Sequence, residues 1–283
     1  MKHRLWINIA LLLAVILLGL FAYLKPLDGP PEHKLTTLKP GDADLLQVRI
    51  AGAEPVAVQR SGAEWRIVAP MNLRADTLQI QRLLGILDAT SKDRFAPTGL
   101  ARYDLNEPRA SLTINKQTFS FGAVNEMSRE QYVLAQDGVY LLPMRYGAAL
   151  PKSALQLVSK QLFAAEESPV AFEFSNFRLA QQEGKWQLTP ANDAAADDIT
   201  RWVDEWRLAA ALDVLPASNR KPLHTIKIKL KNGNDVTLSV LEQEPALVLA
   251  RGDQAVEYQL SGAAAKRLLA APAVAPPAPA PAK

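Results

Sequence analysis

The sequence predicts an α+β fold of two tandem repeats, each an antiparallel sheet covered by amphipathic helices, preceded by one N-terminal transmembrane helix. Three observations support this prediction. A long apolar run lies near the N-terminus, motifs recur about 120 positions apart, and short segments alternate between apolar and polar residues. The chain has 283 residues, of which 48% are hydrophobic and 22% charged, a composition typical of a globular protein.

The first element is the apolar segment 5–24, which follows a short cytoplasmic stub at 1–4. Twenty helical residues span about 30 Å, the thickness of a bilayer's hydrocarbon core. Trp6 and Tyr23 lie at its two ends, where amphipathic rings favour the headgroup region. The alternative is a cleaved signal peptide, but its apolar region is shorter, and Leu20 stands where cleavage requires a small residue. We therefore expect an uncleaved transmembrane helix.

Charge and composition predict where the chain lies and which partners it lacks. Lys2, His3 and Arg4 precede the apolar run, which favours a cytoplasmic N-terminus, a single pass through a bacterial inner membrane and a periplasmic remainder. The chain has no cysteine, which excludes disulfides, thiolate nucleophiles and cysteine-bound metals. A net charge of +3 without a basic cluster does not favour nucleic acid.

Two low-complexity segments flank the repeats. Residues 25–44 are rich in Pro, Gly and charge and predict a stiff spacer. Residues 271–283 form a Pro/Ala-rich tail that we expect to be disordered. A solvated chain end is the simpler interpretation of this tail, and a docking peptide for a partner is the alternative.

The repeats are identified by motifs with a constant separation. Trp65 and Trp186 are 121 positions apart, and so are Asp76 and Asp197. A repeat of this length indicates two copies of one supersecondary unit packed side by side. We place repeat 1 at 45–165 and repeat 2 at 166–270.

Each repeat is predicted to begin with three short strands and an amphipathic helix. The strands are expected at 45–51, 55–60 and 64–69, then at 170–175, 177–182 and 184–189. Asp76 with Gln79 resembles a capping box at the first helix. The apolar stripes have helical spacing. They are Ile80, Leu83, Leu84 and Leu87 in the first helix, and Ile199, Trp202, Val203, Trp206 and Ala210 in the second.

Hairpins and a closing helix are predicted to complete each repeat. Alternating segments flank an Asn115-Lys116 turn and an Asn232-Gly233 two-residue turn. One face of each sheet is then apolar, and the amphipathic helix is its natural cover. Closing helices are expected at 146–163 and 261–270.

Several motifs of this chain together resemble the bacterial family called domain of unknown function 4340. They are Trp65, Pro70, Ala75-Asp76, Leu83-Leu84, Tyr103-Asp104-Leu105 with Pro108, Phe121-Gly122, Tyr132-Val133 and Val139-Tyr140. The resemblance covers most of 45–262 and departs at Asp104, where Gly is expected. It implies an N-terminal membrane helix and, for some members, a role in ABC-type export or gliding systems. The family has no established catalytic residues, so it implies no site.

The sequence predicts no catalytic or metal site and no cofactor. His3, His33 and His224 lack metal-ligand spacing, and His224 is expected at the start of a strand. Ser218-Asn-Arg-Lys221 matches the Ser-x-x-Lys motif, but its flanking prolines indicate a loop, where the motif cannot work.

Two further patterns have structural explanations. Asp197-Asp198 is explained by helix capping. Trp202 and Trp206 lie one helical turn apart and are interpreted as core, with a ligand-stacking platform as the alternative.

One surface pattern remains as a candidate binding site. Lys227, Lys229 and Lys231 alternate along a predicted strand. They are interpreted as residues that protect a sheet edge and maintain solubility, or as a surface for anionic lipid or a wall polymer.

The sequence therefore predicts a non-enzymatic, membrane-tethered periplasmic scaffold or adaptor that contacts envelope or membrane proteins. The alternative is a binding module for an envelope glycan or anionic lipid. An enzyme is the third and weakest hypothesis, because it would need a pocket with buried carboxylates from both repeats.

Overall fold

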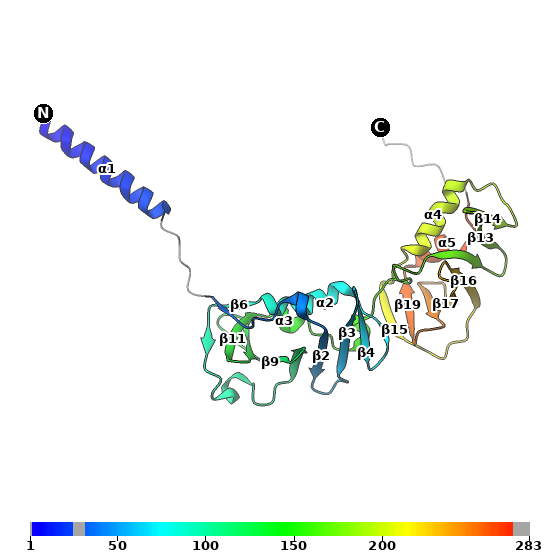
Figure 1. The fold of residues 1–283 in the computed structure, drawn as a ribbon, viewed down its shortest axis with the longest axis horizontal. Helices are drawn as coiled ribbons and strands as arrows, with labels where there is room; N and C mark the ends of the chain where they lie inside the picture. Colours follow the sequence, from blue (N-terminus) through cyan, green and yellow to red (C-terminus); the bar gives the residue numbers. More distant parts are fainter. Residues whose placement is uncertain (1, 25–31, 274–283) are drawn as a thin grey trace.

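Two antiparallel sheets lie side by side in the computed structural model, which describes residues 2–24 and 32–273 (Figure 1). Short helices cover one face of each sheet. One sheet with its helices is called the first module and the other the second module. The chain is thus mostly antiparallel sheet with a few helices, in agreement with the predicted α+β class.

The N-terminal segment is helical. α1 (Lys2–Leu24) contains the predicted anchor, and eleven of its large apolar side chains between Trp6 and Leu20 are exposed. Among the described residues, no helix is long and apolar enough to span a membrane.

The first module contains a nine-stranded sheet with the order β5-β4-β3-β2-β8-β9-β10-β11-β7. Its strands are β2 (Leu45–Ile50), β3 (Val56–Ser61), β4 (Glu64–Ala69), β5 (Leu73–Arg74), β7 (Arg94–Phe95), β8 (Ala110–Ile114), β9 (Gln117–Val124), β10 (Glu130–Ala135) and β11 (Gly138–Pro143). A two-stranded sheet of β1 (His33–Lys34) and β6 (Thr90–Ser91) lies beside it.

The second module repeats this path with the order β14-β13-β12-β16-β17-β18-β19-β15. Its strands are β12 (Pro169–Glu173), β13 (Arg178–Gln182), β14 (Lys185–Thr189), β15 (Asp213–Pro216), β16 (His224–Leu230), β17 (Asp235–Glu242), β18 (Leu247–Arg251) and β19 (Val256–Leu260). The order matches that of the first sheet strand for strand, except that β5 has no counterpart among the residues that the structure describes. This shared order is what the sequence repeat predicts.

The helices of the modules follow the predicted stripes. They are α2 (Thr77–Leu84), continued by η2 (Gly85–Asp88), α3 (Arg145–Ala148), α4 (Ala196–Arg207) and α5 (Gly262–Leu269), with further short turns η1 (Pro40–Asp42), η3 (Leu100–Tyr103) and η4 (Ala154–Leu157). The stripe residues are buried in both modules except Ala210. The prediction for Ala210 is wrong because α4 ends at Arg207, and Ala210 pairs as extended backbone with Gln161.

Asp76 caps α2 as predicted, since its carboxylate accepts hydrogen bonds from the Leu78 and Gln79 N–H groups at 2.8 and 3.2 Å. The reciprocal half of a capping box is replaced by a tertiary contact. The Asp76 N–H donates to the Leu157 carbonyl at 2.7 Å, not to the Gln79 side chain.

Three local predictions need correction. The helix expected at 146–163 is only α3, because Pro151 interrupts it and the residues after η4 are extended. The loop containing Asn232-Gly233 is longer than two residues, since Lys229 pairs with Asp235 and the Leu230 N–H donates to the Asn234 carbonyl. Part of the predicted spacer packs onto the first module, where Leu35 and Ala43 are buried. Residues 25–31 of the spacer and 274–283 of the tail lie outside the described residues.

The linker (residues 157–162) joins the two sheets through its backbone. On one side, the Ser159 N–H donates to the Arg74 carbonyl of the first module at 2.8 Å. On the other, the Leu162 N–H donates to Ala209, and the Lys160 carbonyl accepts from Ala211, at 3.0 and 2.8 Å. Leu157 and Leu162 are buried, so the linker belongs to the shared core. The modules are therefore coupled by a paired and buried segment.

Candidate functional site

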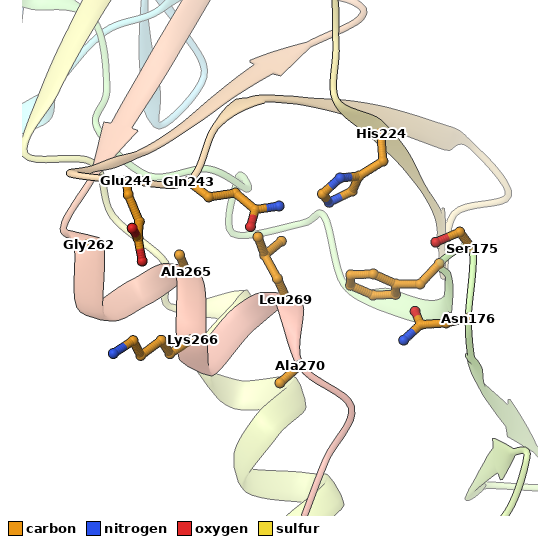
Figure 2. A pocket seen from close by; sticks show the side chains of 11 residues that line it. Ser175, Asn176, His224, Gln243, Glu244, Gly262, Ala265, Lys266, Leu269 and Ala270 are labelled. Carbon is orange, nitrogen blue, oxygen red and sulfur yellow. The ribbon is translucent and has the colours of Figure 1, made fainter.

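A concavity with polar walls and an apolar floor lies in the second module and is called the α5 pocket (Figure 2). Its volume is about 600 Å³. One wall is α5, and the others are the β12–β13 turn, the first residue of β16 and the β17–β18 connection. It is lined by Phe174, Ser175, Asn176, His224, Gln243, Glu244, Gly262, Ala265, Lys266, Leu269 and Ala270.

Each wall has a local reason for its position. An added Cβ at Gly262 would collide with the Pro245 carbonyl, so only glycine allows α5 to begin this close to the β17–β18 connection. Phe174 and Phe177 stack at 4.2 Å between ring centroids, which closes the β12–β13 turn. His224 opens β16 as predicted, and its partner across the sheet is Val240.

The pocket combines an apolar floor with free polar groups. Figure 2 shows His224 and Gln243 facing one another above Leu269, while Lys266 projects from the rim. Within the described part of the chain, no hydrogen bond joins the side chains of His224, Asn176 or Gln243 to other protein groups. These amide and imidazole groups are therefore available to a polar ligand.

The titratable side chains that line the pocket are His224, Glu244 and Lys266. Glu244 is its single carboxylate. Among the described residues, no group of three or more His, Asp or Glu side chains could hold a metal ion.

Lys227 and Lys229 of the predicted lysine ladder are exposed on the outer face of β16, whereas Lys231 is exposed in the turn just after the strand. The structure corrects one part of its interpretation, because β16 lies between β12 and β17 and is not an edge strand. Acidic residues flank two of the lysines: Lys229 Nζ lies 4.0 Å from Asp235, and Lys227 pairs across the sheet with Glu173. Lys227, Lys229 and Lys231 are thus part of a mixed-charge face.

The Ser218-x-x-Lys221 motif lies in an irregular segment, as predicted. Ser218 donates its hydroxyl hydrogen to Glu257 Oε1 at 2.6 Å, and Arg220 forms an ion pair with the same carboxylate. Burial alone would raise the pKa of Glu257, but the hydrogen bonds from Ser218 and Arg220 outweigh it and lower this pKa. Ser218 is thereby held against a carboxylate, and the motif ties this loop to β19.

A second buried ion cluster attaches the linker region to β18. The Arg251 guanidinium is buried and donates to the Leu162 carbonyl at 2.7 Å, to Glu167 and to Asp253. Burial acts to raise the pKa of Glu167, yet hydrogen bonds from Arg251 and the Ala164 N–H keep it below its ordinary value. Arg251 thus joins Leu162 and Glu167 to β18, and we assign this cluster to the stability of the fold.

The tryptophans are core residues, as predicted. Trp206 is fully buried and Trp202 nearly so, and their rings meet edge to face at 6.0 Å. Their indole N–H groups donate to Leu268 and Ala270, at and just after the end of α5, at 3.1 and 2.9 Å. Asp198 accepts from the Ala195 N–H at 3.3 Å, which supports its predicted role in capping α4.

The α5 pocket is not among the sites that the sequence predicts. Its walls come from four segments that are distant in the chain, and no local motif marks them. The one available signal was His224, a lone polar ring at the first position of an alternating strand.

A family model described as domain of unknown function (DUF4340) matches residues 65–229, which extends from β4 through the linker to β16. No curated protein and no solved structure matched the chain.

Proposed function

This chain belongs to the DUF4340 family. We propose that it is a non-enzymatic, membrane-anchored scaffold or adaptor of the bacterial cell envelope. In this role it is an auxiliary subunit of an envelope or ABC-type export complex. The anchor is α1, and the two modules lie on the periplasmic side.

The observation that carries the proposal is the coupling of two similar modules by a buried linker with hydrogen bonds to both. Such coupling holds two similar surfaces at a fixed spacing, which suits a protein that positions partners. The family match covers residues 65–229, which include this linker and its backbone partners in both modules.

The anchor is supported by the composition of α1. Residues 5–24 are apolar except Asn8, and their described large side chains are exposed and not buried in the core of either module. An exposed apolar helix is favourable in lipid and unfavourable in water. A tether would also raise the local concentration of the modules near membrane partners.

Fractionation and crosslinking test the proposal. We expect the full-length chain to stay in the membrane after an alkaline wash, and a reporter fused after Lys283 to report the periplasm. Crosslinking in intact cells, followed by purification, should recover membrane or periplasmic proteins in fixed ratio. Recovery of the protein alone, or of a shortened soluble form, would contradict the proposal.

A binding module for an envelope glycan is the second candidate, and the α5 pocket favours it. Phe174 offers an apolar ring surface, and Asn176 and Gln243 offer free amides, a combination that suits a sugar. Soluble peptidoglycan fragments should bind the full chain, and the double variant Asn176→Ala, Gln243→Ala should lose this binding. Equal binding by both proteins would remove the pocket from consideration.

An anionic lipid bound by the lysine ladder is the other ligand of this second candidate. Reversal to Glu at Lys227, Lys229 and Lys231 should then release the modules from vesicles that contain phosphatidylglycerol. The flanking Glu173 and Asp235 reduce the local positive potential. Unchanged vesicle binding would exclude this face.

A further inference from the structure

β14 (Lys185–Thr189) is an edge strand of the second sheet and, among the residues that the structure describes, pairs with β13 alone. Its counterpart β4 pairs with β3 and also with β5, through Arg66–Arg74 and Ile67–Leu73. The position that β5 fills in the first module is therefore unfilled in the second. An unfilled edge leaves backbone donors and acceptors available to another strand.

Hydrogen-bonded and non-hydrogen-bonded residue pairs alternate along the β13–β14 hairpin, and this alternation identifies the backbone groups of β14 that point away from β13. The β13–β14 turn is Glu183–Gly184, with φ of 50° and 80°, so the flanking pair Gln182–Lys185 exchanges both hydrogen bonds. Because the pattern alternates, the N–H and C=O groups of Trp186 and Leu188 point away from β13. The backbone of Trp65, the counterpart of Trp186, also points away from the neighbouring strand β3, since its carbonyl accepts a hydrogen bond from the Ala75 N–H at 2.8 Å.

The side chains at this edge are suited to a partner of the same kind. Trp186 and Leu188 are half-buried against the core on the helix side, and Trp186 lies 6.3 Å from Phe172 between ring centroids. Lys185, Gln187 and Thr189 are exposed on the opposite face. Lys185 is the single charge on the strand.

We propose that β14 pairs with β14 of a second copy of this chain, antiparallel about a two-fold axis at Gln187. In this register Trp186 lies opposite Leu188 of the second copy, and both pairs exchange their outward groups in about four backbone hydrogen bonds. Apolar side chains meet apolar side chains, and Lys185 meets Thr189, so no like charges face each other. Both the side chains of β14 and its outward backbone groups therefore complement those of a second copy.

Cysteine crosslinking tests this register directly, because the natural chain has no cysteine. At the axis, Gln187 faces its own copy in a non-hydrogen-bonded pair, with Cα atoms about 4.5 Å apart, a separation that permits a disulfide. Full-length Gln187→Cys, oxidised in its membranes, should give a covalent dimer on a non-reducing gel. The matched control is Arg66→Cys, at the same place on β4, where β5 covers the edge, and it should remain monomeric. No dimer from Gln187→Cys above the control level overturns the proposal.

A charge variant provides a second, non-covalent measurement. Gln187→Glu places two carboxylates opposite each other and should weaken the dimer about tenfold, whereas Gln187→Thr should leave it unchanged. Sedimentation of the full chain in detergent measures both. An equally strong dimer from Gln187→Glu contradicts the proposed register. Crosslinking of Gln187→Cys to a different protein, with no self-dimer, would show that β14 accepts a foreign strand and would also overturn the proposal.

Discussion

At the scale of single residues, Gly122 in β9 shows how closely a loop can pack onto the sheet of the first module. An added Cβ there would collide with the Tyr103 carbonyl and lie 2.8 Å from Leu105 Cγ. The segment 100–105 therefore reaches the outer face of the sheet only because residue 122 has no side chain. Tyr103 and Leu105 form a small satellite core there with Val139.

Gly122→Ala should consequently lower the free energy of unfolding by about 1–3 kcal/mol, the usual cost of overpacking. Chemical denaturation of the full chain in detergent measures this loss. Gly41→Ala is the matched control, because nothing lies within 4 Å of its added Cβ, and it should have little effect. Similar stability for the two variants would contradict the close approach at Gly122.

Arg251 is a second residue on which the fold depends. Its buried guanidinium donates hydrogen bonds to the Leu162 carbonyl and to the carboxylates of Glu167 and Asp253. Arg251→Met leaves Glu167 and the Leu162 carbonyl without this donor. We expect a loss of about 3 kcal/mol, as for other broken buried ion pairs. The control Arg178→Met removes an exposed pair with Glu173 and should cost less than about 1 kcal/mol in the same denaturation experiment.

The same cluster predicts a dependence on pH. The folded-state pKa of Glu167 lies below its ordinary value of 4.5, so its ion pair stabilises the fold fully above that pH. This stabilisation is lost as the pH falls below 4.5 toward the lowered pKa. Glu167→Gln should therefore lose less stability than the natural chain when the pH is lowered from about 5 to about 3. Parallel acid profiles for the two proteins would contradict this role.

At the scale of elements, helix α2 depends on one cap. The Asp76 carboxylate accepts from two N–H groups of the first turn. Asp76→Ala should destabilise the first module by about 1 kcal/mol, whereas Asp76→Asn should retain most of the cap. Thermal unfolding of the two variants tests this difference, and equal midpoints would show that the cap is dispensable.

The elements were largely predictable from the sequence, because each sheet has one buried and one exposed face. The alternation of buried and exposed residues in His224–Leu230 follows directly from these two faces. Because the sequence repeats, the strands predicted in one module could also be predicted in the other. Prediction failed at 146–163 because a buried extended segment and a buried helix share the same apolar composition. It failed again at the α5 pocket, which exists only after four distant segments have folded together.

At the scale of the whole molecule, the linker decides whether the two modules behave as one body. Its first half pairs with Arg74 and its second half with 209–211, while its apolar side chains fill the space between the modules. The core is accordingly continuous from the first module into the second. We therefore expect the two modules to unfold in a single transition.

Ser159→Pro tests this coupling, because proline removes the N–H that donates to the Arg74 carbonyl at 2.8 Å and leaves the pairing with 209–211 in place. The first module should then unfold separately from the second, and calorimetry of the full chain should resolve two transitions in place of one. Ser159→Ala keeps the N–H and should retain a single transition. Two transitions in the natural chain, or one in Ser159→Pro at an unchanged midpoint, would mean that the modules are held at a fixed spacing by something other than this backbone pairing.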